Sequence, residues 1–138
     1  MKETPKLPDR YQLIDEIGEG ATCTVYRAHD LQLNRDVAIK VVRRNLAIHA
    51  RFRARFAREV ALGAEVIHPR IIPVLDSGRL TNGCPFVSLA HADGGSLSDL
   101  LKMRPPMAEA IRIIEQVLDA LAHLHAHGLL HQDLKPAN

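Results

Sequence analysis

Three polar residues near the end of the chain have types and a spacing suited to catalysis. Asp133 is followed by Lys135 two positions later and by Asn138 five positions later, after a long apolar segment. On a loop, this spacing can place a carboxylate near a hydroxyl group, a cation near a phosphoryl group and an amide oxygen on a metal ion. The pattern therefore predicts a loop for phosphoryl transfer. The alternative is an ordinary polar loop capped by Asp133, because short motifs also match by chance.

Lys40 is a second candidate, because it stands inside an apolar run. The segment Asp36–Val42 is rich in β-branched residues and predicts a short strand. Alternation puts Ala38 and Lys40 on one face of that strand and the branched residues on the other. A lysine here can extend its side chain into solvent. It can also bind phosphate oxygens, with the small Ala38 leaving room for a flat ring.

A hairpin with two glycines comes before this strand. Residues 11–42 predict three strands, and Gly18 and Gly20 lie at the tip of the first hairpin. Glycine lets backbone amides approach a phosphate closely, which a side chain would prevent. Cys23 stands where a third glycine would complete the G-x-G-x-x-G pattern. The hairpin is therefore either a phosphate-covering flap or an ordinary glycine-rich turn.

A carboxylate interrupts the apolar face of the helix expected over residues 46–67. The apolar stripe consists of Phe52, Phe56, Val60 and Gly63. Glu59 lies along the face expected to be buried, where an unpaired charge costs on the order of several kcal/mol. Arg55, four residues earlier, can pair with it locally. Lys40 is the alternative partner.

Turn residues and periodicity predict the remaining elements. Strands at 71–75 and 86–90 bring the number of strands to five, and Asp93–Gly95 marks a flexible break. Ser96 and Asp99 then match a capping box that opens a short helix.

A long helix is expected from Ala108 to Ala126, with Gly128 at its C-terminal cap. It carries six large aliphatic residues on one face. Of its last histidines only His123 and His127 share a face, so they do not predict a metal site.

Composition places the chain among globular proteins. The 138 residues are 46% hydrophobic and 25% charged, with a net charge of +2. So mild a charge, without tryptophan, disfavours nucleic-acid binding. Cys23 and Cys84 are isolated, which argues against zinc and disulfides and favours a reducing compartment such as the cytoplasm. No run approaches the roughly 18 apolar residues of a membrane span.

In this order the motifs resemble the N-terminal part of a protein kinase domain, of the eukaryotic-like (Hanks-type) Ser/Thr kinases of bacteria. The matching motifs are Gly18-x-Gly20-x-x-Cys23-x-Val25, Val37-Ala38-Ile39-Lys40, Arg58-Glu59-Val60, His68-Pro69-x-Ile71, Asp93-Gly94-Gly95-Ser96-Leu97 and His131-Gln132-Asp133-Leu134-Lys135-Pro136-Ala137-Asn138. The resemblance implies an α+β, protein-kinase-like fold. A five-stranded antiparallel N-lobe with one main helix would precede the first helices and catalytic loop of a truncated helical C-lobe. The expected boundaries are an extension at 1–10, the N-lobe at 11–90, a hinge at 91–95 and the C-lobe start at 96–138.

The resemblance also implies roles for individual residues and a Ser/Thr protein kinase activity that uses ATP and Mg²⁺. The implied ATP-binding residues are Ile17, Gly18, Gly20, Val25, Ala38, Lys40, Leu89, Ala90, His91 and Ala92. Lys40 would bind the α- and β-phosphates while paired with Glu59. Asp133 would accept or orient the hydroxyl of a protein substrate. Lys135 would steady the transferring phosphate, and Asn138 would hold Mg²⁺.

Departures from the family pattern refine these expectations. Cys23 replaces the third glycine, with little expected effect on ATP binding. Gln132 replaces the arginine that holds a phosphorylated activation loop, so activation by that route is not expected. The chain ends at Asn138, before the Asp-Phe-Gly metal site, so the 138 residues alone are expected to be inactive. The alternative is a non-catalytic nucleotide- or protein-binding module. Small-molecule kinases of the aminoglycoside type are disfavoured by Lys135-Pro136 and by the glycine flap.

Overall fold

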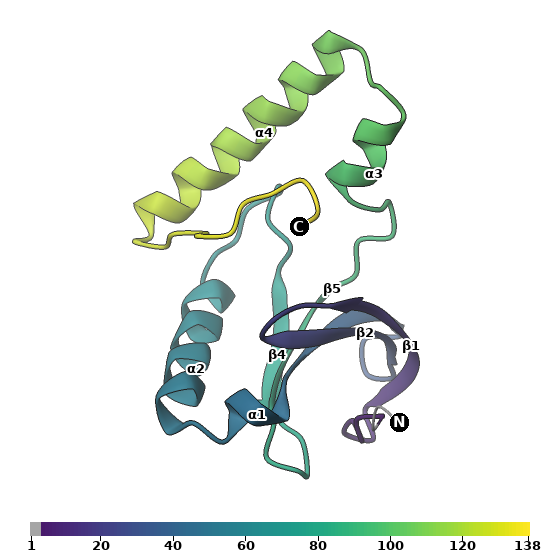
Figure 1. Ribbon diagram of the computed structural model, residues 1–138, viewed down its shortest axis with the longest axis vertical. Coiled ribbons are helices and arrows are strands. Elements are labelled where there is room, and N and C mark those ends of the chain that lie inside the picture. The colour runs from purple at the N-terminus through teal and green to yellow at the C-terminus, as the bar shows by residue number, and fades with distance from the viewer. Residues whose placement is uncertain (1–3) are drawn as a thin grey trace. The chain divides into compact units, whose positions relative to one another are not determined.

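The structure is a computed structural model that describes residues 4–138. Five strands and four helices follow one another in this part of the chain (Figure 1). They are β1 (Tyr11–Glu19), β2 (Cys23–Asp30), β3 (Arg35–Val42), α1 (Arg44–Ala47), α2 (Ala50–Ala64), β4 (Val74–Arg79), β5 (Pro85–Ala90), α3 (Leu97–Lys102) and α4 (Met107–Ala126). The chain divides into two compact units, which we describe separately. Unit 1 comprises the residues up to Glu65 together with Pro73–His91, and unit 2 comprises Val66–Ile72 and Ala92–Asn138.

Unit 1 is built on a five-stranded antiparallel sheet, as the family resemblance implied, and its strand order is β1-β2-β3-β5-β4. Alternation along β3 follows the predicted faces. Val37 and Ile39 are fully buried, Ala38 is half-buried and Lys40 is exposed. The core continues through Tyr11 and Phe86, whose rings meet edge to face with centroids 6.0 Å apart. The buried residues of β3 fix the register of the strand, and this register places Ala38 and Lys40 on the opposite face.

The helix predicted over residues 46–67 is two helices in the structure. The chain breaks between α1 and α2 at Ile48 and His49, and Arg53 explains why the break is stable. Its Nη1 donates hydrogen bonds to the carbonyl oxygens of Ala47 and Ile48, at 2.7 and 3.0 Å. These carbonyls would otherwise be left without partners at the end of α1. Helix α2 also ends at Ala64, earlier than predicted.

The strand predicted at 71–75 begins later, at Val74. Pro73 precedes it and has no N–H to contribute to a ladder, although its carbonyl accepts from Ala90 N at 3.1 Å. Before Pro73, residues 68–71 form a turn, in which the carbonyl of His68 accepts a hydrogen bond from Ile71 N at 3.1 Å. The local apolar pattern was therefore a misleading guide to where this strand starts.

Unit 2 contains α3, α4 and the C-terminal loop. The predicted capping box is confirmed: Ser96 Oγ accepts from Asp99 N at 3.3 Å, and Asp99 Oδ2 accepts from Ser96 N at 3.1 Å. Gly128, with a φ of +71°, ends α4 in the left-handed conformation that favours glycine. None of the helices in the described residues 4–138 is long and apolar enough to span a bilayer.

Candidate active site

The sheet of unit 1 brings several predicted nucleotide-binding residues into one row. Gly18 on β1 pairs with Val25 on β2, and Val25 pairs in turn with Lys40 on β3. On the neighbouring pair of strands, Ala38 pairs with Leu89. A flap, a cation and a small residue are thus placed side by side by backbone pairing alone. Ile17, next to Gly18, is exposed at the same end of β1.

The glycines of the flap are not required by the conformation of the chain. Neither Gly18 nor Gly20 has a positive φ, and a Cβ built on either would meet its nearest neighbour at 3.7 or 3.5 Å, an ordinary contact distance. The fold therefore tolerates a side chain at both positions. Their lack of one leaves the backbone open to close approach, which suits the phosphates of a nucleotide.

Arg43 holds the tip of the flap, which sequence reasoning missed. Its Nε donates to the carbonyl oxygen of Gly20 at 2.8 Å, and its Nη2 pairs with Glu19 Oε1 at 2.7 Å. Its backbone N–H also donates to Thr22 O at 2.9 Å. The available signal was an arginine directly after β3, opposite the start of β2. Burial raises the pKa of the neighbouring Cys23 thiol above its usual value.

Glu59 does not occupy the buried position expected for it. Its side chain is 58% exposed, and its Oε1 accepts a hydrogen bond from Arg55 Nε at 2.8 Å, one helical turn away. Within residues 4–138, no ion pair joins Glu59 to Lys40. Phe52 and Phe56 pack partly buried against the core, but Glu59 lies on the exposed part of α2, so it keeps its hydration and a local partner suffices. The expectation of a buried carboxylate was wrong, and the pairing with Lys40 remains a prediction.

Four of the predicted ATP-binding residues, Leu89, Ala90, His91 and Ala92, run from the end of β5 into the coil of the predicted hinge at 91–95. Leu89 pairs with Ala38 and with Val74, on either side of it. The N–H of Ala90 donates to Pro73 O at 3.1 Å, and this hydrogen bond joins the end of β5 to the residue before β4. His91 is the last residue of unit 1, and Ala92 belongs to unit 2. The role of these four residues in contacting adenine remains a prediction.

The C-terminal loop of unit 2 gathers its three polar residues. Lys135 Nζ lies 3.0 Å from Asp133 Oδ2, and Asn138 Nδ2 lies 3.3 Å from the same oxygen. Asn138 Nδ2 also donates to the carbonyl oxygen of Asp133. The hydrogen bond from Lys135, and then that from Asn138, lower the pKa of the Asp133 carboxyl, so it is ionised at neutral pH. The arrangement supplies an anion beside a cation, on an exposed loop.

Backbone contacts shape this loop and join it to the rest of unit 2. Gln132 has a φ of +61°, a left-handed conformation that turns the chain sharply before Asp133. The N–H of Ser98, in the first turn of α3, donates to Pro136 O at 2.8 Å. In Figure 1 the yellow C-terminal segment turns back from α4 towards α3. The loop is therefore joined to α3 at Pro136, between the second and third members of its polar triplet.

Asn138 fits the role of a metal ligand. Its side chain forms its hydrogen bonds to Asp133 through Nδ2, which leaves the amide oxygen available. Carboxylate and amide oxygens are the ligands that Mg²⁺ prefers. Asn138 would hold the ion, and Asp133 lies beside it. The described residues 4–138 do not contain a ready-made cluster of three metal-ligating side chains.

Histidines of unit 2 form a stack that the sequence did not reveal. His68 Nε2 pairs with Asp119 Oδ2 at 3.1 Å, and the ring of His123 lies between those of His68 and His127, at 4.8 and 4.5 Å. His127 Nδ1 contacts the carbonyl of His123 at 2.9 Å. The ring planes are tilted by 37° between His68 and His123 and by 42° between His123 and His127. The stack joins Val66–Ile72 to α4.

Comparison with known proteins identifies the family. The protein kinase domain family matches residues 11–138, nearly the whole chain. The chain belongs to the protein kinase family. This kinase chain is 42% identical over 141 residues to the serine/threonine-protein kinase PknB of Mycolicibacterium smegmatis, covering 98% of this chain and 23% of that protein. It is 38% identical over 143 residues to PknB of Mycobacterium leprae, covering 100% of this chain and 23% of that protein. The kinase chain thus spans less than a quarter of these relatives.

Solved structures confirm the predicted fold. Two structures of the PknI kinase domain of Mycobacterium tuberculosis are similar to this kinase chain, with TM-scores of 0.80 and 0.81 at 30% and 29% identity. They match 94% and 100% of this chain and 53% and 57% of theirs. The five-stranded sheet with its helices is therefore the N-lobe of a protein kinase, followed by the first part of a C-lobe.

Proposed function

We propose that this chain forms the nucleotide-binding lobe and the catalytic loop of a kinase that transfers the γ-phosphoryl group of ATP to serine or threonine hydroxyls of proteins. The observation that carries the proposal is the triplet in which Asp133 lies within 3.3 Å of both Lys135 and Asn138. An ionised carboxylate, a lysine and an amide oxygen are among the groups that kinases use for phosphoryl transfer to a hydroxyl. The relatives named Ser/Thr kinases support the substrate class.

Each residue of the triplet has a separate task in this proposal. Asp133, ionised at neutral pH, accepts a hydrogen bond from the substrate hydroxyl and directs its oxygen towards phosphorus. Lys135 stabilises negative charge on the transferring group, which requires it to exchange Asp133 for phosphate oxygens. Asn138 would hold Mg²⁺, which supplies charge neutralisation at the phosphates when bound.

In unit 1, Lys40 would bind phosphate oxygens below the flap formed by Gly18 and Gly20. Its paired partner would be Glu59, which must first leave Arg55. An exposed pair four residues apart on a helix contributes only about 0.2–0.5 kcal/mol, so this exchange requires little energy. We infer a reducing compartment such as the cytoplasm for the chain, because Cys23 and Cys84 are both free thiols.

The experiment that tests the proposal uses the intact protein that carries this chain. It is incubated with Mg²⁺ and labelled ATP and a generic protein substrate, and the modified residues are identified. Wild type should label serine or threonine, and Asp133→Asn should lower kcat by about 10²- to 10⁴-fold. Full activity in the Asp133→Asn variant would refute the role of this residue.

A non-catalytic binding module is the second candidate, and the pairing of Glu59 with Arg55 in place of Lys40 favours it. The same assay separates the two. Nucleotide binding by the intact protein without any phosphoryl transfer would support the binding module.

A further inference from the structure

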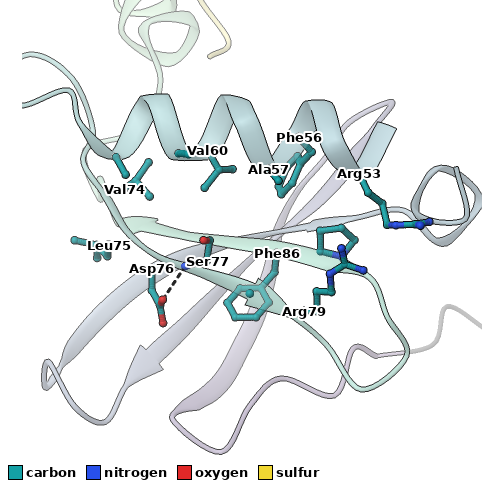
Figure 2. A pocket seen from close by; sticks show the side chains of 14 residues that line it. Arg53, Phe56, Ala57, Val60, Val74, Leu75, Asp76, Ser77, Arg79 and Phe86 are labelled. Atoms are coloured by element: carbon teal, nitrogen blue, oxygen red, sulfur yellow. Dashed lines mark hydrogen bonds between the residues drawn. The ribbon is translucent and has the colours of Figure 1, made fainter. Parts of the chain in front are cut away.

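A cavity of about 540 Å³ lies in unit 1, at the end of the sheet where β3 passes into α1. Its walls come from the chain before β1, from the neighbouring ends of β1, β2 and β3, and from the connection between β4 and β5. The volume lies within the roughly 300–1,000 Å³ of typical ligand sites. Figure 2 shows a different space, beneath α2, and no residue that lines that space also lines this cavity.

The cavity lies on the face of the sheet opposite the predicted nucleotide site. Thr24 on β2 pairs with Val41 on β3, and both line the cavity. The next pair along these strands is Val25 with Lys40, which belongs to the predicted nucleotide site. Because successive side chains of a strand point to opposite faces, the two pairs face away from each other. A ligand in the cavity would therefore be separated from the nucleotide by the sheet.

The lining of the cavity combines apolar and polar groups. Val41, Val42 and Cys84 are buried, with at most 7% of each residue exposed, and offer an apolar surface. The other lining residues include hydroxyl and amide side chains, from Thr4, Thr24, Tyr26, Asn45, Thr81 and Asn82. An apolar surface with a few polar groups beside it is the usual composition of a small-molecule site.

The charges at the cavity are mainly positive. Lys6, Arg43 and Arg44 line it together with one carboxylate, that of Glu19. The carboxylate of Glu19 is engaged by Arg43, whose Nη2 lies 2.7 Å from its Oε1. Lys6 is exposed, and no carboxylate in the part of the chain that the structure describes pairs with it. The cavity thus has an excess of positive charge, which favours an anion.

We propose that this cavity binds a small phosphomonoester with an apolar organic part. A phosphomonoester carries a charge of about −1.5 to −2 at neutral pH, which matches an excess of cations better than a single carboxylate does. Lys6 and Arg44 would hold the phosphate, since guanidinium groups bind phosphate oxygens through pairs of charge-assisted hydrogen bonds. The organic part would lie against Val41 and Val42.

Arg43 connects this cavity to the tip of the flap. Its Nε donates to Gly20 O at 2.8 Å and its Nη2 pairs with Glu19, while the same side chain lines the cavity. A bound phosphate would compete with Glu19 for the guanidinium group and draw it away from the flap. The effect of this release on ATP binding rests on the proposed function, whereas the binding of the phosphomonoester and the release of Arg43 do not.

The test is an NMR titration of the ¹⁵N-labelled chain with phenyl phosphate at about pH 7.5, where the phosphate is mostly dianionic. Backbone N–H signals of Thr24, Thr81 and Asn82 should shift and saturate, and so should the side-chain Nε–H signal of Arg43. Inorganic phosphate lacks the ring and benzyl alcohol lacks the charge, so each should bind about tenfold or more weakly than phenyl phosphate.

Two variants of the chain place the binding in the cavity. Lys6→Gln and Arg44→Gln each remove one cation at an exposed position, and each should raise the dissociation constant of phenyl phosphate by about tenfold. The matched control is Arg35→Gln, at the opposite end of β3 and outside the cavity, which should leave binding unchanged. Thermal unfolding of each variant shows that it is folded.

Four results would overturn the proposal. The first is the absence of saturable shifts in a chain that unfolds cooperatively on heating. The second is a set of shifts at Val25, Ala38 and Lys40 in place of the cavity, which would put the phosphate in the predicted nucleotide site. The third is equal weakening by Arg35→Gln and Lys6→Gln. The fourth, an unmoved Arg43 Nε–H signal at saturation, would exclude the release of Arg43. No measurement uses ATP, so failure would leave the proposed kinase activity untouched.

Discussion

Arg10 and Asp30 form a bidentate ion pair beside the sheet. Arg10 Nε lies 2.9 Å from Asp30 Oδ1, and Arg10 Nη2 lies 2.7 Å from Asp30 Oδ2. The Asp30 side chain is fully buried, and it also accepts from the N–H groups of Gln32 and Leu33 at 2.9 and 3.1 Å. The pair fastens the chain just before β1 to the end of β2, so it fixes where the sheet begins.

Removing Arg10 should destabilise the protein markedly, because it leaves a buried carboxylate without its counter-charge. We expect Arg10→Gln to lower the melting temperature by at least about 5 °C. The matched control is Arg27→Gln, which breaks the exposed pair of Arg27 with Asp15. That change should have little effect, since exposed pairs contribute little. Equal shifts for both variants would contradict a special role for Arg10.

Asp30 should make the stability of the protein depend on pH in the acidic range. The hydrogen bond from Arg10 is the main cause that lowers the pKa of Asp30 below its usual value. A lowered pKa in the folded state gives stability that is present above the unfolded value of about 3.9 and is lost as pH falls through the folded value. The free energy of unfolding, measured with urea between about pH 6 and pH 2, should therefore fall less steeply with decreasing pH in Asp30→Asn than in wild type. Asp15→Asn, at an exposed position, serves as control, and parallel slopes for all three proteins would contradict the assignment.

Arg43 should affect nucleotide binding without contacting the nucleotide. Loss of its bonds to Gly20 and Glu19 frees the tip of the flap, which must then be ordered when ligand binds. We expect Arg43→Gln to raise the dissociation constant for ATP by about two- to fivefold with little change in melting temperature. Arg51→Gln, on the exposed face of α2, is the control. If both variants bind ATP as wild type does, the contacts of Arg43 with Gly20 and Glu19 have no role in ATP binding.

Arg55 competes with Lys40 for Glu59 in the proposed function. Arg55→Gln should remove that competition and lower the dissociation constant for ATP by roughly twofold, given the small energy of an exposed helical pair. Arg58→Gln changes the exposed arginine next to Glu59, whose ion pair is with Arg55, and should have no effect. Isothermal titration measures both, and weaker ATP binding in Arg55→Gln would contradict the competition.

The 138-residue chain itself should bind nucleotide without transferring phosphate. It contains one predicted metal ligand, Asn138, where the reaction uses two metal-holding groups. Labelled ATP with Mg²⁺ and a protein substrate should therefore give no phosphoprotein, whereas fluorescence titration should detect nucleotide binding that Lys40→Met weakens. Mg²⁺-dependent phosphorylation by the purified chain would defeat this prediction.

Local sequence was enough to predict some features and not others. The two faces of β3 follow from alternation, and the capping box of α3 follows from Ser96 and Asp99 at a spacing of three. The exposure of Glu59 depends on how α2 lies over the sheet, which no stripe of apolar residues specifies. The break before α2 depends on Arg53 reaching back to the end of α1, a contact that helical periodicity does not reveal.

Contacts between distant residues account for most of the remainder. Arg10 bonds Asp30 and Asp76, which are 20 and 66 positions away. Nothing in the sequence around Arg10 names these partners. Asp30 lies on β2, which pairs with β1, whereas Asp76 lies on β4, at the other end of the strand order. The polar triplet of the C-terminal loop was predictable for the opposite reason: its three members lie within six consecutive positions.

The hydrogen bond from Ser98 N to Pro136 O joins the loop of Asp133 to α3 through backbone atoms only. Neither side chain takes part, so position 98 can accept any residue that retains an N–H, and position 136 is unconstrained by this bond. Substitution of the side chains at these two positions therefore does not remove this hydrogen bond. The contact by which α3 supports the proposed catalytic loop therefore does not depend on the side chains of these two residues.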